Sequence, residues 1–143
     1  MQSFALINGD LAIGGAGGYV TLSGVDRIRQ DLTLALWEEY GTDRFHPRYG
    51  SIVKQYLGSP ITPELQQLVK AEVNRVIQNY IAIQQAEVIR GTQFDIVGMF
   101  DTSDVVRSLD GIDVRTALDA IYVRATLTTL ARERVTISRQ VSL

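Results

Sequence analysis

The sequence predicts an α+β fold in which two main helices pack on a small, mostly antiparallel sheet with a C-terminal β-hairpin. Two segments repeat apolar residues at helical spacing, over residues 24–40 and from residue 63 onward. The last part of the chain instead alternates apolar and polar side chains, which is typical of strands with one buried face. A length of 143 residues is enough for one domain with its own core.

The composition excludes several functional classes. The chain has no cysteine and one histidine, His46, which excludes disulfides, thiolate zinc sites and sites with two imidazoles. A net charge of −2 argues against the broad basic face of a nucleic-acid-binding protein. No apolar run approaches the ~20 residues of a membrane span, and the N-terminus does not read as a signal peptide. We therefore expect no nucleic-acid or membrane partner. We expect the protein to be assembled in a cytoplasm.

Residues 1–22 are predicted to form an extended arm. Residues 4–7 and 19–22 favour extended structure, and residues 8–10 (Asn-Gly-Asp) are a turn signal. The glycines of residues 14–18 lack the lysine, the hydroxyl and the following helix of a phosphate-binding loop. We interpret them as a flexible turn.

Residues 23–143 are predicted to form a single α+β domain. Ser23 is a candidate N-cap, and Asp26 three residues later can complete a capping box. The apolar spacing then predicts a helix over residues 24–40 that ends at Gly41.

A second, long amphipathic helix is predicted after a short connection. Residues 51–57 favour a short helix that ends at Gly58. Thr62 as the cap and Pro63 at the first helical position mark the start of the long helix. Its apolar stripe predicts an end between residues 81 and 86.

The rest of the chain is predicted to be mainly strands. Residues 87–100 read as one or two strands, residues 103–109 as a helical turn, and residues 112–115 as a short strand. Residues 120–130 and 134–141 are the clearest strands, separated by a turn. They form a predicted β-hairpin that projects from the domain, over about residues 120–143.

The segment of residues 41–51 combines aromatic side chains, arginines, a proline and glycines. Arginine and tyrosine are enriched at the energetic centres of protein interfaces, so the segment is a candidate docking loop. The alternative is a structured loop whose Phe45 and Tyr49 fill the core. Both can hold, with Phe45 pointing inward and Arg44 and Arg48 pointing outward.

Three carboxylates, Glu38, Glu39 and Asp43, cluster in the sequence. A pair of carboxylates can act as acid and base in sugar hydrolysis. Adjacent glutamates on a helix, however, point about 100° apart. We therefore interpret the cluster as solvated and expect no catalytic residue.

Other candidate chemistry is equally weakly supported. A triad of Ser51, His46 and an aspartate lacks the pattern of a nucleophile elbow. His46 has no second histidine or closely spaced carboxylates to complete a metal site. Trp37 is expected in the core. We therefore expect neither a metal nor a cofactor.

Residues 40–51 read Tyr-Gly-Thr-Asp-Arg-Phe-His-Pro-Arg-Tyr-Gly-Ser. This segment resembles the baseplate wedge family of contractile injection systems, which includes the sheath-initiator protein of contractile phage tails and a related type VI secretion component. Residues 8–10 and 23–30 resemble the family's entry into its first helix, and residues 121–123 (Ile-Tyr-Val) its closing hairpin. Many members end the second helix with Glu-Pro-Arg, whereas residues 79–84 here read Asn-Tyr-Ile-Ala-Ile-Gln.

The resemblance implies a structural, non-enzymatic role in the tail baseplate of a virion that assembles in the host cytoplasm, with six copies around the tail. The implied partners are baseplate wedge proteins and the tail sheath protein. The tail tube or hub is a further partner that the resemblance allows. The wedge-interface candidates are Arg44, Phe45, Pro47, Arg48, Tyr49 and Gly50. The candidates for strand pairing with the sheath are Tyr122, Arg124, Thr126, Thr128, Arg134, Thr136, Ser138 and Arg139.

An exposed hairpin edge is a template for strand addition, which agrees with this role. Residues 115–139 hold five arginines against Asp119 and Glu133, so this segment carries +3. These arginines either steer an acidic sheath arm or solvate the outer face of the hairpin. Deletion of residues 132–143 is expected to leave a folded domain that no longer nucleates sheath.

Two other functions remain open from the sequence. One is a small glycosidase or lysozyme-like enzyme, and the other is a free-standing protein-binding module. The sequence also leaves open whether the particle is a phage, a tailocin or a secretion system.

Overall fold

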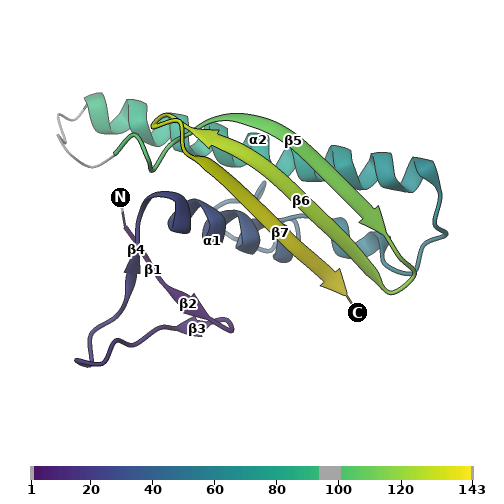
Figure 1. Ribbon diagram of the computed structural model, residues 1–143, viewed down its shortest axis with the longest axis horizontal. Helices are drawn as coiled ribbons and strands as arrows, with labels where there is room; N and C mark the ends of the chain where they lie inside the picture. The colour runs from purple at the N-terminus through teal and green to yellow at the C-terminus, as the bar shows by residue number, and fades with distance from the viewer. Residues whose placement is uncertain (1, 94–100, 143) are drawn as a thin grey trace.

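The computed structural model describes residues 2–93 and 101–142, and its architecture is α+β, as the sequence predicts (Figure 1). Its main elements are the helices α1 (Gly24–Trp37) and α2 (Pro63–Gln93), the 3-10 helix η1 (Val53–Tyr56), and the strands β5 (Val106–Thr116), β6 (Ala120–Thr129) and β7 (Arg134–Ser142). These three strands form an antiparallel sheet in the order β5-β6-β7, so β6 is central.

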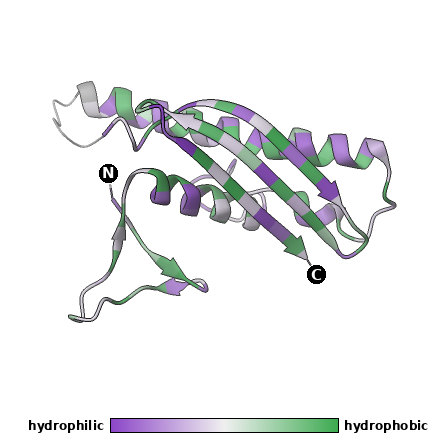
Figure 2. Ribbon diagram, in the orientation of Figure 1, coloured by the Kyte–Doolittle hydropathy of each residue, from purple (hydrophilic) through white to green (hydrophobic). Residues whose placement is uncertain are grey.

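The helices cover one face of this sheet, and the core lies between the two layers. α2 runs along β5 behind the sheet, and α1 lies beside β7 (Figure 1). The largest fully buried side chains include Ile28, Leu32, Leu36, Val69, Val73, Ile77, Ile121, Leu127, Val135 and Ile137. Hydrophobic and hydrophilic residues alternate along β6 and β7 (Figure 2), and the hydrophobic set faces the helices. The outer face of the sheet is polar and open to solvent.

The N-terminal arm folds back on itself as two very short antiparallel ladders. They pair β1 (Ser3–Phe4) with β4 (Thr21–Leu22) and β2 (Leu6–Ile7) with β3 (Asp10–Leu11). The predicted turn joins β2 to β3, with Asn8 and Gly9 both at positive φ.

Gln30 of α1 ties this arm to the body. The Leu6 N–H donates to Gln30 Oε1 at 2.8 Å, and Gln30 Nε2 donates to the Phe4 carbonyl oxygen at 2.8 Å. The arm therefore has a defined place beside the start of α1.

The start of α1 is where the sequence predicts it, but its cap differs. Ser23 occupies the N-cap position, yet its side chain makes no capping hydrogen bond. Instead, the Gly24 N–H donates to the carboxylate of Asp104, a residue 80 positions later. The predicted capping box with Asp26 is therefore wrong, because a distant carboxylate occupies the end of the helix.

α1 ends at Trp37, three residues before the predicted end. Glu38 is extended, with φ −70° and ψ 140°, and its carbonyl oxygen accepts a hydrogen bond from the Ser51 N–H at 2.8 Å. This contact from a distant segment ends the helix before Gly41.

The connection to α2 confirms two predictions. η1 is the short helix expected before Gly58. Thr62 caps α2, since the Leu65 N–H donates to Thr62 Oγ1 at 3.1 Å, and Pro63 is the first helical residue.

α2 continues to Gln93, so both the predicted end at residues 81–86 and the predicted strand over residues 87–93 are wrong. Residues 94–100, the rest of that predicted strand region, lie outside the described residues. The helix continues because Gln84, a polar residue on its buried face, has partners there.

Gln84 Nε2 donates to the Tyr80 hydroxyl at 3.0 Å and to the Asp104 carbonyl oxygen at 2.9 Å, and its Oε1 accepts the Val106 N–H at 3.0 Å. A buried amide with its hydrogen bonds satisfied costs little, so it does not interrupt the helix.

β5 is one long strand, whereas the sequence predicted a helical turn at residues 103–109 and a short strand at 112–115. Its register with β6 shifts between Val106 and Ser108 and again between Leu109 and Gly111. Such bulges break the alternation of apolar and polar residues by which a strand is recognised.

β6, β7 and the turn at Arg132 confirm the predicted hairpin and its alternation. The hairpin does not project, however, because β6 is paired on both sides. Val135, Ile137 and Val141 of β7 are completely buried. The expectation that the domain folds without residues 132–143 is therefore incompatible with the place of β7 in the core.

Candidate functional site

The docking loop, residues 41–51, is closed at its base by backbone hydrogen bonds. The Tyr40 N–H donates to the Ser51 carbonyl oxygen and the Gly41 N–H to the Tyr49 carbonyl oxygen, each at 3.2 Å. Ser51 is buried and its hydroxyl donates to the Leu36 carbonyl oxygen at 2.7 Å. The two ends of the loop are thus fixed to each other and to the last turn of α1.

An ion pair on α2 anchors the same loop from the other side. Arg75 Nη2 donates to Glu72 Oε1 at 2.7 Å and to the Gly50 carbonyl oxygen at 2.8 Å. Glu72 Oε1 also accepts the Ile52 N–H at 3.0 Å, and the Arg75 guanidinium lies 4.6 Å from the centre of the Tyr40 ring. Burial alone would raise the pKa of Glu72, but the hydrogen bonds from Arg75 and Ile52 outweigh it and leave that pKa lowered.

Sequence reasoning missed this anchor. Its signal was a charged residue, Glu72, directly beside Val73 on the apolar stripe of α2, with Arg75 one turn later. A charge at a buried position is rarely left unpaired, so the pair could have been expected.

Gly50 is required by the loop geometry. Its φ is +90°, and a Cβ there would lie 2.6 Å from the Glu39 carbonyl oxygen and 2.8 Å from that of Glu38. Only glycine fits a left-handed backbone this close to another chain segment. Gly50 is therefore a support of the loop rather than a contact surface.

The tip of the loop points into solvent. Arg44, Pro47 and Arg48 are exposed, and Phe45 is 90% exposed, so the expected inward position of Phe45 is wrong. The reason is Asp43, whose Oδ1 accepts the N–H groups of Phe45 at 2.7 Å and His46 at 3.2 Å and turns the backbone outward.

The other aromatic of the loop fills the core, as the alternative interpretation expected. Tyr49 packs partly buried against the core, and its hydroxyl donates to the Asp31 carbonyl oxygen at 3.4 Å. Burial, and then the nearby charge of Asp31, raises the pKa of Tyr49 to about 12. Among the six wedge candidates, Arg44, Phe45, Pro47 and Arg48 thus form one exposed tip, and Tyr49 and Gly50 support it.

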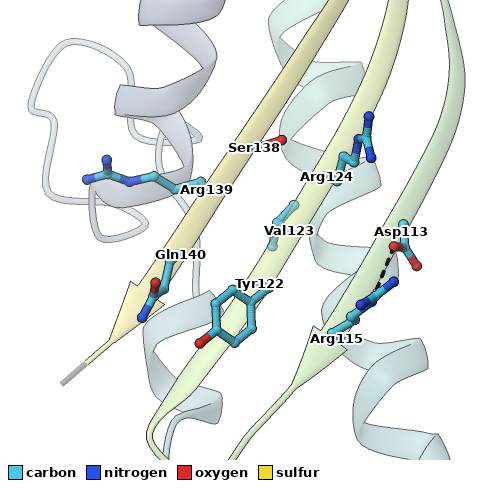
Figure 3. Close-up of a pocket in the computed structure, with 8 residues that line it drawn as sticks. All are labelled: Asp113, Arg115, Tyr122, Val123, Arg124, Ser138, Arg139 and Gln140. Carbon is cyan, nitrogen blue, oxygen red and sulfur yellow. Dashed lines mark ion pairs between the residues drawn. The ribbon is translucent and has the colours of Figure 1, made fainter.

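Seven of the eight strand-pairing candidates carry side chains on the outer face of the sheet. They are Tyr122, Arg124, Thr126 and Thr128 on β6 and Arg134, Thr136 and Ser138 on β7. Figure 3 shows the side chains that line a shallow hollow of about 540 Å³ there, with Tyr122, Arg124 and Gln140 among them. Arg139 differs, since its side chain extends from the outer edge of β7, away from β6 (Figure 3).

The backbone N–H and C=O groups of β6 are directed to its neighbours β5 and β7. The candidates on β6 can therefore offer only their side chains to a partner. β7, in contrast, is an edge. The Thr129 N–H donates to the Glu133 carbonyl oxygen at 2.9 Å, and the β6–β7 register then continues without a shift. In an antiparallel ladder every second residue faces the same neighbour. The outward N–H and C=O groups of β7 therefore belong to Arg134, Thr136, Ser138, Gln140 and Ser142.

Trp37 is not in the core, contrary to expectation, because α1 ends there and leaves its side chain 41% exposed. The Lys54 ammonium lies 4.2 Å and the Arg139 guanidinium carbon 4.7 Å from the centre of its ring. A residue from α1, one from η1 and one from β7 thus form a cationic–aromatic cluster.

The candidate acid–base residues lie at the surface around the docking loop. Glu38 and Glu39 are exposed, and His46 Nδ1 lies 3.1 Å from Asp43 Oδ2 at the loop surface. Within residues 2–93 and 101–142 there is no group of three or more metal-binding side chains. In that same part of the chain, neither helix is long and apolar enough to cross a membrane.

A comparison with protein-family models found no match for the chain, and a comparison with curated protein sequences found no significant match. The interaction surfaces described above are therefore the basis for a functional proposal.

Proposed function

We propose that the protein is a structural, non-enzymatic part of the baseplate of a contractile tail. In this proposal it docks on baseplate wedge proteins through the exposed tip of the docking loop. It then initiates the sheath by adding a strand of the first sheath ring to its own sheet. The protein would act in the tail of the virion, after assembly in the host cytoplasm, without a cofactor.

The observation that carries the proposal is the regular, open outer edge of β7. No other strand of residues 2–93 and 101–142 pairs with this edge. The opposite edge strand, β5, carries two register shifts, and bulges of this kind protect an edge from further pairing. β7 has none and offers outward backbone groups along five alternate residues, which is the template that strand addition uses.

The docking loop supports the other half of the proposal. Its base is fixed by Arg75 and Ser51, so its tip presents Phe45, Arg44 and Arg48 without a large loss of conformational entropy on binding. An exposed aromatic flanked by arginines is the composition of an interface centre.

The experiment uses Ser138→Pro in the full chain, with Ser138→Ala as the matched control. The Ser138 N–H points away from β6, so proline removes an outward donor without breaking the β6–β7 ladder. Both variants are co-expressed with the candidate tail sheath protein. Association is measured by co-purification, sheath nucleation by electron microscopy and folding by circular dichroism.

We expect Ser138→Pro to remain folded but to lose sheath association and nucleation, and Ser138→Ala to keep both. If the folded proline variant nucleates sheath as well as the alanine variant, the proposed role of this edge is wrong.

A further inference from the structure

We propose that the cationic–aromatic cluster of Lys54, Trp37 and Arg139 receives a carboxylate from the strand that adds to β7. This inference rests on the proposed function and names the chemistry of its partner. The occupant is an extended segment with an acidic residue on the side facing α1.

A groove between the N-terminal arm and α1 reaches β7 at Arg139. It has a volume of about 590 Å³, and its lining comes from the N-terminal arm, from α1 and from Arg139 of β7. Its apolar lining residues are Leu6, Leu34 and Trp37, which lies at the C-terminal end of α1, and the other side chains of the lining are polar or charged. An added strand would place alternate side chains over this groove, because successive residues of a strand point to opposite faces.

The position of Arg139 determines which residue of the added strand would carry the carboxylate. It belongs to the same alternate set as Val135, Ile137 and Val141, which face the helices. A cross-strand neighbour lies on the same face with its Cβ about 5 Å away. The residue of an added strand opposite Arg139 therefore has its side chain beside the Arg139 guanidinium and the Trp37 ring.

The cluster has two cations and no counter-charge of its own. In the described part of the chain, neither Lys54 nor Arg139 lies within ion-pair distance of a carboxylate. The other two charged residues of the groove, Asp26 and Arg29, neutralise each other at 2.7 Å.

Arg139 also has an unmet hydrogen-bonding group. Its Nε is buried and donates to no partner, which is a state that a buried donor rarely keeps. A carboxylate arriving with an added strand would accept this hydrogen bond and supply the counter-charge that the cluster lacks. Charge complementarity thus selects an acidic residue rather than an amide or a lysine.

The probes are three nine-residue peptides carried at the end of a soluble protein. Each alternates threonine and valine, and the central valine is replaced by glutamate, glutamine or lysine. The full chain is titrated with each probe, and emission of Trp37, its single tryptophan, reports directly on the cluster. Hydrogen exchange of the backbone amides of residues 134–140 reports strand addition separately.

We expect the glutamate probe to bind about fivefold more tightly than the glutamine probe, and the lysine probe most weakly. Arg139→Gln should remove the preference for glutamate, and Lys54→Gln should reduce it. Arg107→Gln, which removes an exposed cation from β5 at the opposite edge of the same sheet, is the matched control and should keep it.

Two negative results are distinguishable. Equal binding of the glutamate and glutamine probes, with protection of the β7 amides, overturns the carboxylate inference and leaves strand addition in place. If no probe protects those amides, strand addition at β7 is itself wrong, and the proposed function fails with the inference.

Discussion

Arg75 of α2 donates a hydrogen bond to the carbonyl oxygen of Gly50 at 2.8 Å. The two residues are 25 positions apart, and the bond fixes the loop to the long helix at Gly50, which with Gly41 is one of the two loop residues with a left-handed backbone. The same guanidinium is held by Glu72, so the loop, the ion pair and the helix form one unit. The stability of the docking loop can therefore be tested through residues that its exposed tip does not contain.

Gly50→Ala should strongly destabilise the protein, whereas Gly58→Ala is a matched control. Both glycines have positive φ, so both substitutions pay the left-handed penalty of about 1–2 kcal/mol. Only at Gly50 would the new Cβ also meet backbone, 2.6 Å from the Glu39 carbonyl oxygen, while nothing lies within 4 Å at Gly58. Urea unfolding should show a larger loss for Gly50→Ala, and equal losses would contradict the close approach.

Glu72→Gln should lower the free energy of unfolding at pH 7 by about 1 kcal/mol, since it weakens the hydrogen bonds from Arg75 and Ile52. The pKa of Glu72 is lower in the folded than in the unfolded protein. Its contribution is therefore fully present above the unfolded pKa near 4.5 and is lost as the pH falls through the lowered folded pKa.

The difference between the wild type and Glu72→Gln should accordingly shrink in urea titrations below about pH 4.5. Arg90→Ala, on an exposed position of the same helix, is the control and should change stability little at any pH. A wild-type-to-variant difference that stays constant down to pH 2.5 would argue against the ion pair as its source.

The parts of the fold that follow from local sequence could be predicted. The Thr62 cap of α2 and the alternation of β6 and β7 depend on neighbours within a few residues, and both are confirmed. The parts that failed depend on distant residues. Ser51 ends α1 through its bond to Glu38, and Asp104 takes the place of the predicted capping box.

The same distinction between local and distant interactions applies to the candidate site. Tyr49 and the outward arginines of the docking loop were predictable from residue type, but Phe45 was misplaced because the Asp43 turn sets its direction. The edge role of β7 could not be predicted, since it depends on β5 pairing with the other side of β6. Trp37 was expected in the core because nothing local shows that α1 ends at that residue.

Phe45→Ala should leave stability unchanged within about 0.5 kcal/mol, because the ring is 90% exposed and packs on nothing that the fold needs. The same substitution should weaken association with baseplate wedge proteins if the loop tip docks there. Tyr49→Ala is the opposite case, since it removes a ring that packs on the core and should destabilise the fold. Thermal unfolding and a wedge pull-down would separate the two effects, and a Phe45→Ala variant with intact wedge association would argue against this docking role.

Deletion of residues 132–143 should unfold the protein rather than leave a folded protein that no longer nucleates sheath. Val135, Ile137 and Val141 are completely buried, and burial of each such side chain is worth about 1.5–3 kcal/mol. Their combined contribution rivals the 5–15 kcal/mol stability of a typical domain, before the lost β6–β7 ladder is counted. Circular dichroism and a cooperative thermal transition are the measurements. A truncated chain that kept a cooperative transition would mean that β7 is dispensable for the core. Because loss of sheath association after this deletion would follow from unfolding alone, the single substitution at Ser138 is the more informative test of the edge.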